Sequence, residues 1–422
     1  MRKVLVSIIL VLISGYIGYL FGVNKVEWAW KGYQPQITVT NKQPPNPNMN
    51  VDFSIFWTVM DKLEANYYDK TLLDPQKMLD GAVSGMVASL EDPYTAYLPP
   101  VLNQDFKETL AGQFEGIGAE LGMNEQKIVV VAPLDGSPAK EAGLRAGDEI
   151  VKVDGKLTFG WNLNQAVEKI RGPQGSEVLL TVVHKSEENP REVAITRDKI
   201  NVDSVFLWVK EVNEIDEINK DSIPESLRGE KVVYIRLSQF GDRTNQEWLS
   251  MINNLDLQIN QGSNIKGMIL DLRNNPGGYL TDAVFISSEF LPVGSTVVIQ
   301  EDSKKNQTKM NVERKGLLQD VPLVVLINKG SASASEIVSG AMRDHKRARI
   351  IGETSFGKGT IQTAEDLGGG AGLHITVAKW LTPNGTWVHT EGLTPDTVVE
   401  VDTKDQSHDA QLEKAISELL QS

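Results

Sequence analysis

Short apolar runs alternate with amphipathic helical stretches through the second half of the chain, and this alternation limits the fold more than any other feature. The apolar runs are brief and rich in Val and Ile, as expected for buried strands, and they occupy residues 231–237, 267–273, 322–328 and 348–353. Between them, apolar residues recur at helical spacing in residues 245–255, 280–290 and 334–344. Strands that alternate with helices are typical of α/β architecture. We therefore expect the fold class of this region to be α/β.

Two segments of the α/β region carry the residues that point to chemistry. In residues 329–337, K-G-S-A-S-A-S-E-I, a predicted strand turns into a predicted helix, whose free N–H groups and positive dipole end can stabilise an oxyanion. In residues 352–362, G-E-T-S-F-G-K-G-T-I-Q, Lys358 lies between two glycines. A buried neutral lysine can take the proton of a serine hydroxyl, so Ser333 and Lys358 are a candidate nucleophile and base. Residue chemistry alone does not distinguish Ser333 from Ser331, Ser335 and Ser339.

Three other interpretations compete for the same segments. Residues 352–359 nearly match a P-loop, but a glycine stands where that loop needs Ser or Thr to hold Mg²⁺. Ser355 and Lys358 have the S-x-x-K spacing of penicillin-binding enzymes, but the flanking glycines favour a loop over the helix start that this motif needs. A Ser-His-Asp triad would have no G-x-S-x-G elbow and would need a serine near His345, His374 or His389.

From Phe114 to Arg197 the pattern changes to short β runs separated by glycine turns. Two segments resemble parts of a PDZ domain. The first resembles its carboxylate-binding loop and consists of Phe114, Glu115, Gly116, Ile117 and Gly118. The second resembles a later stretch of the same fold and covers residues 143–155, G-L-R-A-G-D-E-I-V-K-V-D-G. The resemblance implies that N–H groups of the loop bind the terminal carboxylate of a peptide while an edge strand pairs with it. The apolar Ile117 favours an apolar last residue in that peptide.

A dinucleotide-binding loop is the alternative for these glycines. The spacing of Gly116, Gly118 and Gly122 is one residue longer than the Rossmann fingerprint, and no suitable βαβ unit surrounds it. Arg171 also has two interpretations. It is either an ordinary surface arginine or a residue that couples the PDZ domain to the catalytic core.

The N-terminus predicts a membrane anchor. No charge occurs between Lys3 and Lys25, and a helix of about 20 apolar residues can cross a bilayer. The stretch is long and lacks an A-x-A cleavage site, so we favour an uncleaved transmembrane helix at residues 1–23 over a signal peptide. The positive N-terminal residues would stay in the cytoplasm and place the remaining chain outside, in a periplasm or at the outer face. Residues 24–52 are predicted to be a polar linker.

Composition excludes several classes of protein. The net charge is −14 and the pI is about 5.0, which argues against nucleic-acid binding. The chain has no cysteine, so thiolate nucleophiles and disulfides are absent. Its five histidines form no H-E-x-x-H pair, which argues against a zinc hydrolase. We expect neither a metal nor a cofactor.

Four motifs together resemble the carboxy-terminal processing peptidases, also called tail-specific proteases. They are D-P-Y-T-A-Y-L, D-L-R-N-N-P-G-G, G-S-A-S-A-S-E-I and G-K-G-T-I-Q, which begin at residues 92, 271, 330 and 357. The resemblance implies that Ser333 is the nucleophile, that Lys358 is the general base and that Gln362 supports the lysine. It further implies that the backbone N–H groups of Gly278 and Ala334 bind the oxyanion.

The resemblance also implies an order of domains. A ClpP/crotonase-like α/β core, residues 198–422, would carry an inserted PDZ domain, residues 114–197, and an N-terminal helical cap, residues 53–113. Asp271 and Arg273 are predicted to make structural contacts near the site. Glu336 is predicted to stabilise the first turn of its helix.

We therefore expect a membrane-tethered, extracytoplasmic serine endopeptidase that recognises the apolar C-terminal tails of its substrates. Candidate partners besides the substrate and the membrane are a second copy of the chain and a regulatory adaptor. The rival hypothesis from another class is a non-catalytic PDZ scaffold. The intact set of Ser333, Lys358 and Gln362 argues against that rival.

Overall fold

The computed structural model describes residues 26–31, 34–39, 52–124, 127–134, 136–161, 163–184, 189–260, 265–401 and 408–421. The predicted anchor, residues 1–23, lies outside this described part. Among the described residues, no helix has both the length and the apolar character that a membrane span needs. The chain divides into two compact units, residues 1–82 and 83–422.

The first unit contains a β-hairpin and helices. Strand β1 (Val26–Lys31) pairs antiparallel with β2 (Gln34–Val39), so the segment predicted as a linker contains regular structure. Strand β1 alternates β-branched or aromatic residues with others, and β2 ends in three β-branched residues, both typical of strands. Helix α2 (Ser54–Asn66) follows, then a short 3₁₀ turn, and α3 (Pro75–Ala88) runs into the second unit.

A six-stranded sheet forms the PDZ-like part of the second unit, in the order β10-β9-β7-β6-β5, with β8 paired to β7. Its strands and helices are β5 (Ala119–Asn124), β6 (Lys127–Pro133), α5 (Pro138–Glu141), β7 (Glu149–Val153), β8 (Lys156–Leu157), α6 (Leu163–Ile170), β9 (Glu177–Val183) and β10 (Arg191–Thr196). Strands β4 (Gln113–Gly116) and β11 (Asp198–Asn201) pair antiparallel at its entrance and exit. This pairing brings both ends of the segment together, as an inserted domain requires.

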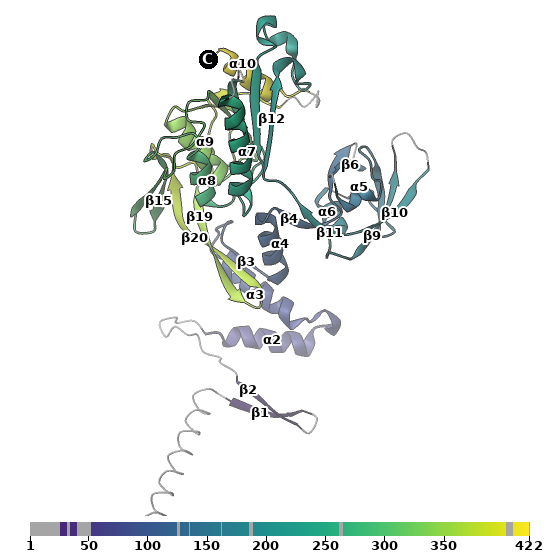
Figure 1. Cartoon of the computed structure of the whole chain (residues 1–422). Coiled ribbons are helices and arrows are strands. Elements are labelled where there is room, and N and C mark those ends of the chain that lie inside the picture. The colour runs from purple at the N-terminus through teal and green to yellow at the C-terminus, as the bar shows by residue number, and fades with distance from the viewer. Residues whose placement is uncertain are drawn as a thin grey trace, which may run out of the picture. The chain divides into compact units, whose positions relative to one another are not determined.

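The core of the second unit is a sheet with helices on both faces (Figure 1). Its order is β12 (Val205–Glu211), β13 (Lys231–Leu237), β14 (Ile265–Asp271), β17 (Leu323–Ile327), β18 (Arg349–Gly352) and β21 (Thr397–Val398). Strand β12 is antiparallel, and the other neighbours are parallel. Helices α7 (Thr244–Asn260), α8 (Leu280–Ser287) and α9 (Ala334–Asp344) pack on one face, and α10 (Ala410–Gln421) packs on the other.

Alternation of side chains along each strand explains why both faces are covered. In β13, Val233 and Ile235 belong to the hydrophobic core under α7, α8 and α9. Their neighbours Val232 and Tyr234 belong to the core under α10. A strand buried on both faces appears in the sequence as a continuous apolar run, as the sequence of β13 shows.

A second sheet has the order β16 (Gln307–Asn311), β15 (Thr296–Asp302), β20 (Ala371–Leu381) and β19 (Thr360–Gly368). The β19–β20 hairpin is long (Figure 1). Strand β3 (Ala96–Leu98) pairs with β20 and is followed by α4 (Pro100–Leu110). This pairing brings the end of the D-P-Y-T-A-Y-L motif onto the same sheet as β19, the strand that begins just after Lys358.

Candidate active site

Ser333 lies where β17 gives way to α9, and its backbone is strained. Its φ is +52° and its ψ is −113°, values that residues other than glycine rarely adopt. Hydrogen bonds beside it hold this conformation, because the Ser331 hydroxyl donates to Leu272 O at 2.8 Å and the Ala332 N–H donates to Asn275 O at 3.0 Å. Strain that the surroundings hold in place is typical of functional residues.

The other serines of the turn have structural roles. Ser331, Ser335 and Ser339 are fully buried, and each hydroxyl donates to a backbone carbonyl, those of Leu272, Asn275 and Ser335 respectively. Ser333 is only partly buried. The geometry therefore favours Ser333, a choice that the residue types alone left open.

The carboxylate of Glu336 joins the serine turn to the lysine loop. Its Oε2 accepts the N–H of Ser333 at 2.8 Å and that of Lys358 at 2.9 Å, so both backbone nitrogens lie within 2.9 Å of one oxygen. Its Oε1 accepts the Ser355 hydroxyl at 2.6 Å and the Gly357 N–H at 2.7 Å. The sequence predicted only a role in the first helical turn. The structure shows that this buried carboxylate also fixes the two segments beside each other.

The side chain of Lys358 is partly buried, and its amine lies over an aromatic ring. Its Nζ is 5.1 Å from the centre of the Tyr94 ring, and the Lys358 carbonyl accepts a hydrogen bond from Trp380 Nε1 at 2.8 Å. Burial lowers the pKa of Lys358, while the charges of Asp92 and Glu336 act in the opposite direction. Burial prevails, so the amine loses its proton at lower pH than an ordinary lysine.

Gln362 lies on β19, close to the lysine in sequence. Its Nε2 donates to the hydroxyl of Thr360 at 2.9 Å and to that of Thr376 at 3.1 Å. These two bonds use both amide hydrogens, so only the carbonyl oxygen of Gln362 is left to accept a hydrogen bond from an amine. The amide can thus support an amine without adding a negative charge.

The N-P-G-G loop packs directly on the serine turn. A Cβ at Gly277 would lie 2.8 Å from Ser333 Cβ and 2.9 Å from Ala334 N, so only glycine fits there. Gly278 has a φ of +140°, and a Cβ on it would lie 1.8 Å from Phe240 O. Within the part of the chain that the structure describes, neither the Gly278 N–H nor the Ala334 N–H donates to a protein acceptor. Two free donors are therefore present near Ser333.

Asp271 and Arg273 make the structural contacts that the sequence predicted. The Tyr234 hydroxyl donates to Asp271 Oδ2 at 2.7 Å, and Arg273 Nη2 donates to the same carboxylate at 2.6 Å. Arg273 also binds Asp409 at 2.8 Å and Gln411 at 3.1 Å, residues just before and in α10. This network ties the end of β14, which leads into the N-P-G-G loop, to the C-terminal helix.

Arg273→Ala is expected to lower the free energy of unfolding by about 3–5 kcal/mol, because it leaves the buried Asp271 carboxylate without its cation. Lys107→Ala is the control, since Lys107 and Asp366 are both exposed and pair at 3.9 Å, a contact worth about 0–1 kcal/mol. Urea unfolding of both variants measures the difference. Equal losses of unfolding free energy in the two variants would show that the Arg273 network stabilises the fold no more than an exposed ion pair does.

The structure argues against the competing interpretations of the lysine segment. Residues 353–359 connect β18 to β19 without a helix, whereas a P-loop and an S-x-x-K motif both need one. The Ser355 hydroxyl donates to Glu336 and accepts the Leu393 N–H at 2.6 Å, so it is used structurally. His345 Nε2 contacts the Thr296 carbonyl at 2.7 Å, away from the serine turn.

The predicted carboxylate-binding loop begins in β4 and ends at a left-handed glycine. Ile117 is buried in the core of the PDZ-like domain, so its side chain is not freely exposed for a peptide. Gly118 has a φ of +72°, and a Cβ on it would lie 2.4 Å from Ser137 Cβ. Arg171 stacks on Phe114, with its guanidinium carbon 4.9 Å from the ring centre. A cavity of about 770 Å³ borders Phe114, Glu115 and Arg171.

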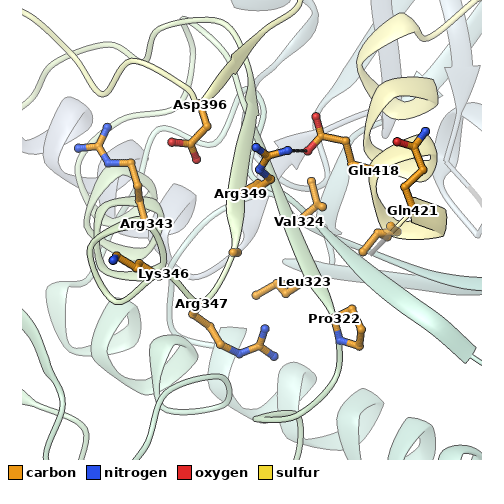
Figure 2. A pocket seen from close by; sticks show the side chains of 12 residues that line it. Pro322, Leu323, Val324, Arg343, Lys346, Arg347, Arg349, Asp396, Glu418 and Gln421 are labelled. Carbon is orange, nitrogen blue, oxygen red and sulfur yellow. Dashed lines mark hydrogen bonds and ion pairs between the residues drawn. The ribbon is translucent and has the colours of Figure 1, made fainter.

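Figure 2 shows a second cavity, of about 690 Å³, at the other end of the core sheet. It lies at the starts of β17 and β18, whereas Ser333 follows the end of β17. Two of its cations already have partners, because Arg349 pairs with Glu418 at 3.1 Å and Arg347 donates to the carbonyls of Phe290, Leu318 and Val321. We therefore place the candidate active site at Ser333 and not in this cavity.

The fold and site together define a serine peptidase core with a PDZ domain, and comparisons with known proteins agree. Residues 231–399 match the model of peptidase family S41, residues 129–183 match the PDZ domain, and residues 13–100 match the activating protease CtpB N-terminal domain. The chain belongs to the carboxy-terminal processing proteases of family S41, which are serine-type peptidases. The predicted family is thereby confirmed.

Three similar proteins illustrate the relationship. The chain is 37% identical over 341 residues to the carboxy-terminal processing protease CtpA of Bacillus subtilis, covering 81% of this chain and 67% of that protein. It is 37% identical over 364 residues to the carboxy-terminal-processing protease of Bartonella bacilliformis, covering 86% and 78%. The solved photosystem II D1 C-terminal processing protease is 28% identical, with a TM-score of 0.50, covering 87% of this chain and 97% of that one.

Proposed function

We propose that Ser333 and Lys358 form a catalytic dyad that hydrolyses peptide bonds on a ClpP/crotonase-like core. The observation that carries this proposal is the Glu336 carboxylate, which holds the backbone N–H groups of both residues on one oxygen. Their side chains therefore start from neighbouring points of the backbone despite their separation in sequence. Burial lowers the pKa of Lys358, which makes the neutral amine that a base requires easier to form.

The mechanism follows from these placements. Neutral Lys358 takes the hydroxyl proton of Ser333 as the oxygen attacks the peptide carbonyl. The N–H groups of Gly278 and Ala334 donate to the oxyanion, and the start of α9 adds its positive dipole end. Lys358 then gives the proton to the leaving amine, and water hydrolyses the acyl-enzyme. Gln362 accepts a hydrogen bond from the amine through its carbonyl oxygen.

We further propose that the PDZ domain binds the C-termini of substrates and prefers apolar ones, and that Arg171 couples this binding to the core. An N-terminal helix at residues 1–23 would tether the enzyme to the cell membrane, with its catalytic part extracytoplasmic, on the periplasmic or outer face. A second copy of the chain or an adaptor would be a regulatory partner. The uncharged stretch after Lys3 supports the tether, and the match of residues 129–183 to the PDZ domain supports the binding of C-termini.

The test is cleavage of one unfolded protein that ends in either an apolar or an acidic tail, by the full chain in detergent. Loss of the apolar tail is expected to lower the cleavage rate about 10-fold or more, the effect of about 1.4 kcal/mol of lost tail binding. Ser333→Ala should still bind the apolar tail without cutting the protein. Equal cleavage of both substrates would contradict tail recognition. Tail binding without cleavage by the unmodified chain would favour the scaffold hypothesis.

A further inference from the structure

The segment that connects α3 to β3 lies against the lysine loop, although nothing in its sequence predicts a chemical role. Strand β3 pairs with β20 so that Ala96 faces His374, and the Thr95 hydroxyl accepts the Thr376 N–H at 3.0 Å. These contacts anchor the turn that precedes β3. Thr376 also binds Gln362, so the anchor of the turn and the predicted support of the lysine share one residue.

The aromatic ring of Tyr94 covers the amine of Lys358, at 5.1 Å from the ring centre. The ring is itself supported, because it packs edge-on against His389 at 6.1 Å, and His389 stacks on Trp387 at 5.0 Å. Trp387 Nε1 donates to Gly359 O at 2.8 Å, which ties this aromatic group to the residue next to Lys358. The amine is therefore confined by a ring whose π face attracts a cation.

The carboxylate of Asp92 is held in place on the same turn. It accepts the Thr95 hydroxyl at 2.7 Å and the Tyr94 N–H at 3.0 Å. Burial raises the pKa of Asp92, but hydrogen bonds from Thr376, Thr95 and Tyr94 outweigh burial and leave the pKa below its usual range. Asp92 is thus an anion wherever a lysine base could operate.

The other titratable groups that face Lys358 come from three further places. Glu336 on α9 already accepts hydrogen bonds from four donors on its two oxygens. His374 on β20 has its pKa lowered by burial and by the charge of Lys358, which argues for a neutral imidazole. His389 lies behind the Tyr94 ring. The charge of Asp92 acts on the amine more strongly than that of Glu336, and Asp92 lies on the same turn as the Tyr94 ring.

We propose that Asp92 and Tyr94 are positioning residues for the base Lys358, with the Tyr94 ring confining the amine and the Asp92 carboxylate serving as counter-charge to the ammonium that forms when Ser333 is deprotonated. This inference rests on the proposed dyad. During the reaction the amine becomes a cation, and the ring that already covers it, together with the nearby charge of Asp92, stabilises that cation without reorganising. The D-P-Y part of the motif thus acts in the chemistry through Lys358.

The test is the pH dependence of kcat/KM for peptide cleavage by the full chain carrying Asp92→Asn. The asparagine keeps one oxygen for the Tyr94 N–H and turns its NH₂ group toward the Thr95 hydroxyl, which can accept as well as donate. The turn is therefore retained while the charge is lost. The rising limb of the profile should move to lower pH by about 1 unit, because a neutral lysine is easier to form without the nearby anion. Asp366→Asn, an exposed carboxylate on β19, is the control and should leave the limb in place.

Two tyrosine variants test the role of the ring. Tyr94→Phe keeps the aromatic face and should retain the activity of the unmodified enzyme. Tyr94→Ala should lower kcat/KM about 10-fold or more, since the amine loses its confinement. Equal activities of the two variants would contradict the role of the ring.

Two results separate this inference from the proposed dyad. If Lys358→Ala is inactive and Asp92→Asn keeps an unshifted limb, the dyad holds and the role of Asp92 is overturned. If Lys358→Ala itself keeps activity with the same pH limb, the dyad fails and the inference fails with it. If Asp92→Asn shifts the limb and Lys358→Ala abolishes activity, both the dyad and the role of Asp92 are supported.

Discussion

Ser333→Ala and Lys358→Ala are each expected to lower kcat/KM by about 10⁴-fold or more, the usual cost of removing a catalytic nucleophile or its base. Ser335→Ala should stay within about 10-fold of the unmodified enzyme. The Ser335 hydroxyl is buried and donates to Asn275 O, so its removal lowers the free energy of unfolding by about 1 kcal/mol without removing a reacting group. Cleavage of a tail-bearing protein at fixed pH measures all three.

Ser335→Ala is also the matched control, because it removes the same atom two residues further along the same turn. Circular dichroism should show that all three variants are folded. An inactive Ser335→Ala variant together with an active Ser333→Ala variant would show that the nucleophile is misassigned. Three inactive but folded variants would leave no basis for preferring Ser333 from geometry.

The second large effect concerns Glu336. Glu336→Ala removes the acceptor of four donors, three backbone N–H groups and the Ser355 hydroxyl, in a fully buried position. Each unsatisfied buried donor costs about 1–3 kcal/mol, so the loss of stability should be about 4 kcal/mol or more. Activity should fall about 100-fold or more even where the chain stays folded, because misplacement of a catalytic group by about 1 Å has such an effect.

Glu336→Gln and Glu353→Gln refine this prediction. Glutamine keeps the shape of Glu336 but turns an amide toward N–H donors, so activity should fall while most of the fold remains. Glu353, in the loop between β18 and β19 that also contains Lys358, pairs with the exposed Lys329 at 2.8 Å, and loss of this pair should cost about 1 kcal/mol or less. Thermal unfolding and cleavage rates, measured for both variants, show whether the Glu336 carboxylate aligns the two segments. If Glu336→Gln behaves as Glu353→Gln does, the carboxylate does not align the two segments.

Periodic segments were predictable from the sequence. The apolar runs at residues 231–237 and 322–328 correspond to β13 and β17, and the helix predicted at 334–344 is α9. Such elements are specified locally, by which residues must be buried. The β1–β2 hairpin within the predicted linker was missed because neighbouring Pro and Asn residues dominated the composition there.

Contacts between distant segments were not predictable. Glu336 and Lys358 are 22 residues apart, and spacing alone does not show that a helix-start carboxylate accepts the N–H of a later loop. The S-x-x-E pattern from Ser333 to Glu336 was a signal, but it also fits an ordinary capping box. Tyr94 lies over Lys358 because β3 pairs with β20, a pairing that neither segment specifies alone. The membrane anchor lies outside the described residues and stays a prediction.

Covalent labelling with a serine-reactive fluorophosphonate, followed by peptide mapping, tests the central claim most directly. The account predicts a single label on Ser333 and almost no label in Lys358→Ala. It also predicts that the labelling rate rises at a lower pH than the pH at which an ordinary lysine loses its proton. A label on another serine, or a Lys358→Ala variant that reacts as fast as the unmodified protein, would contradict it.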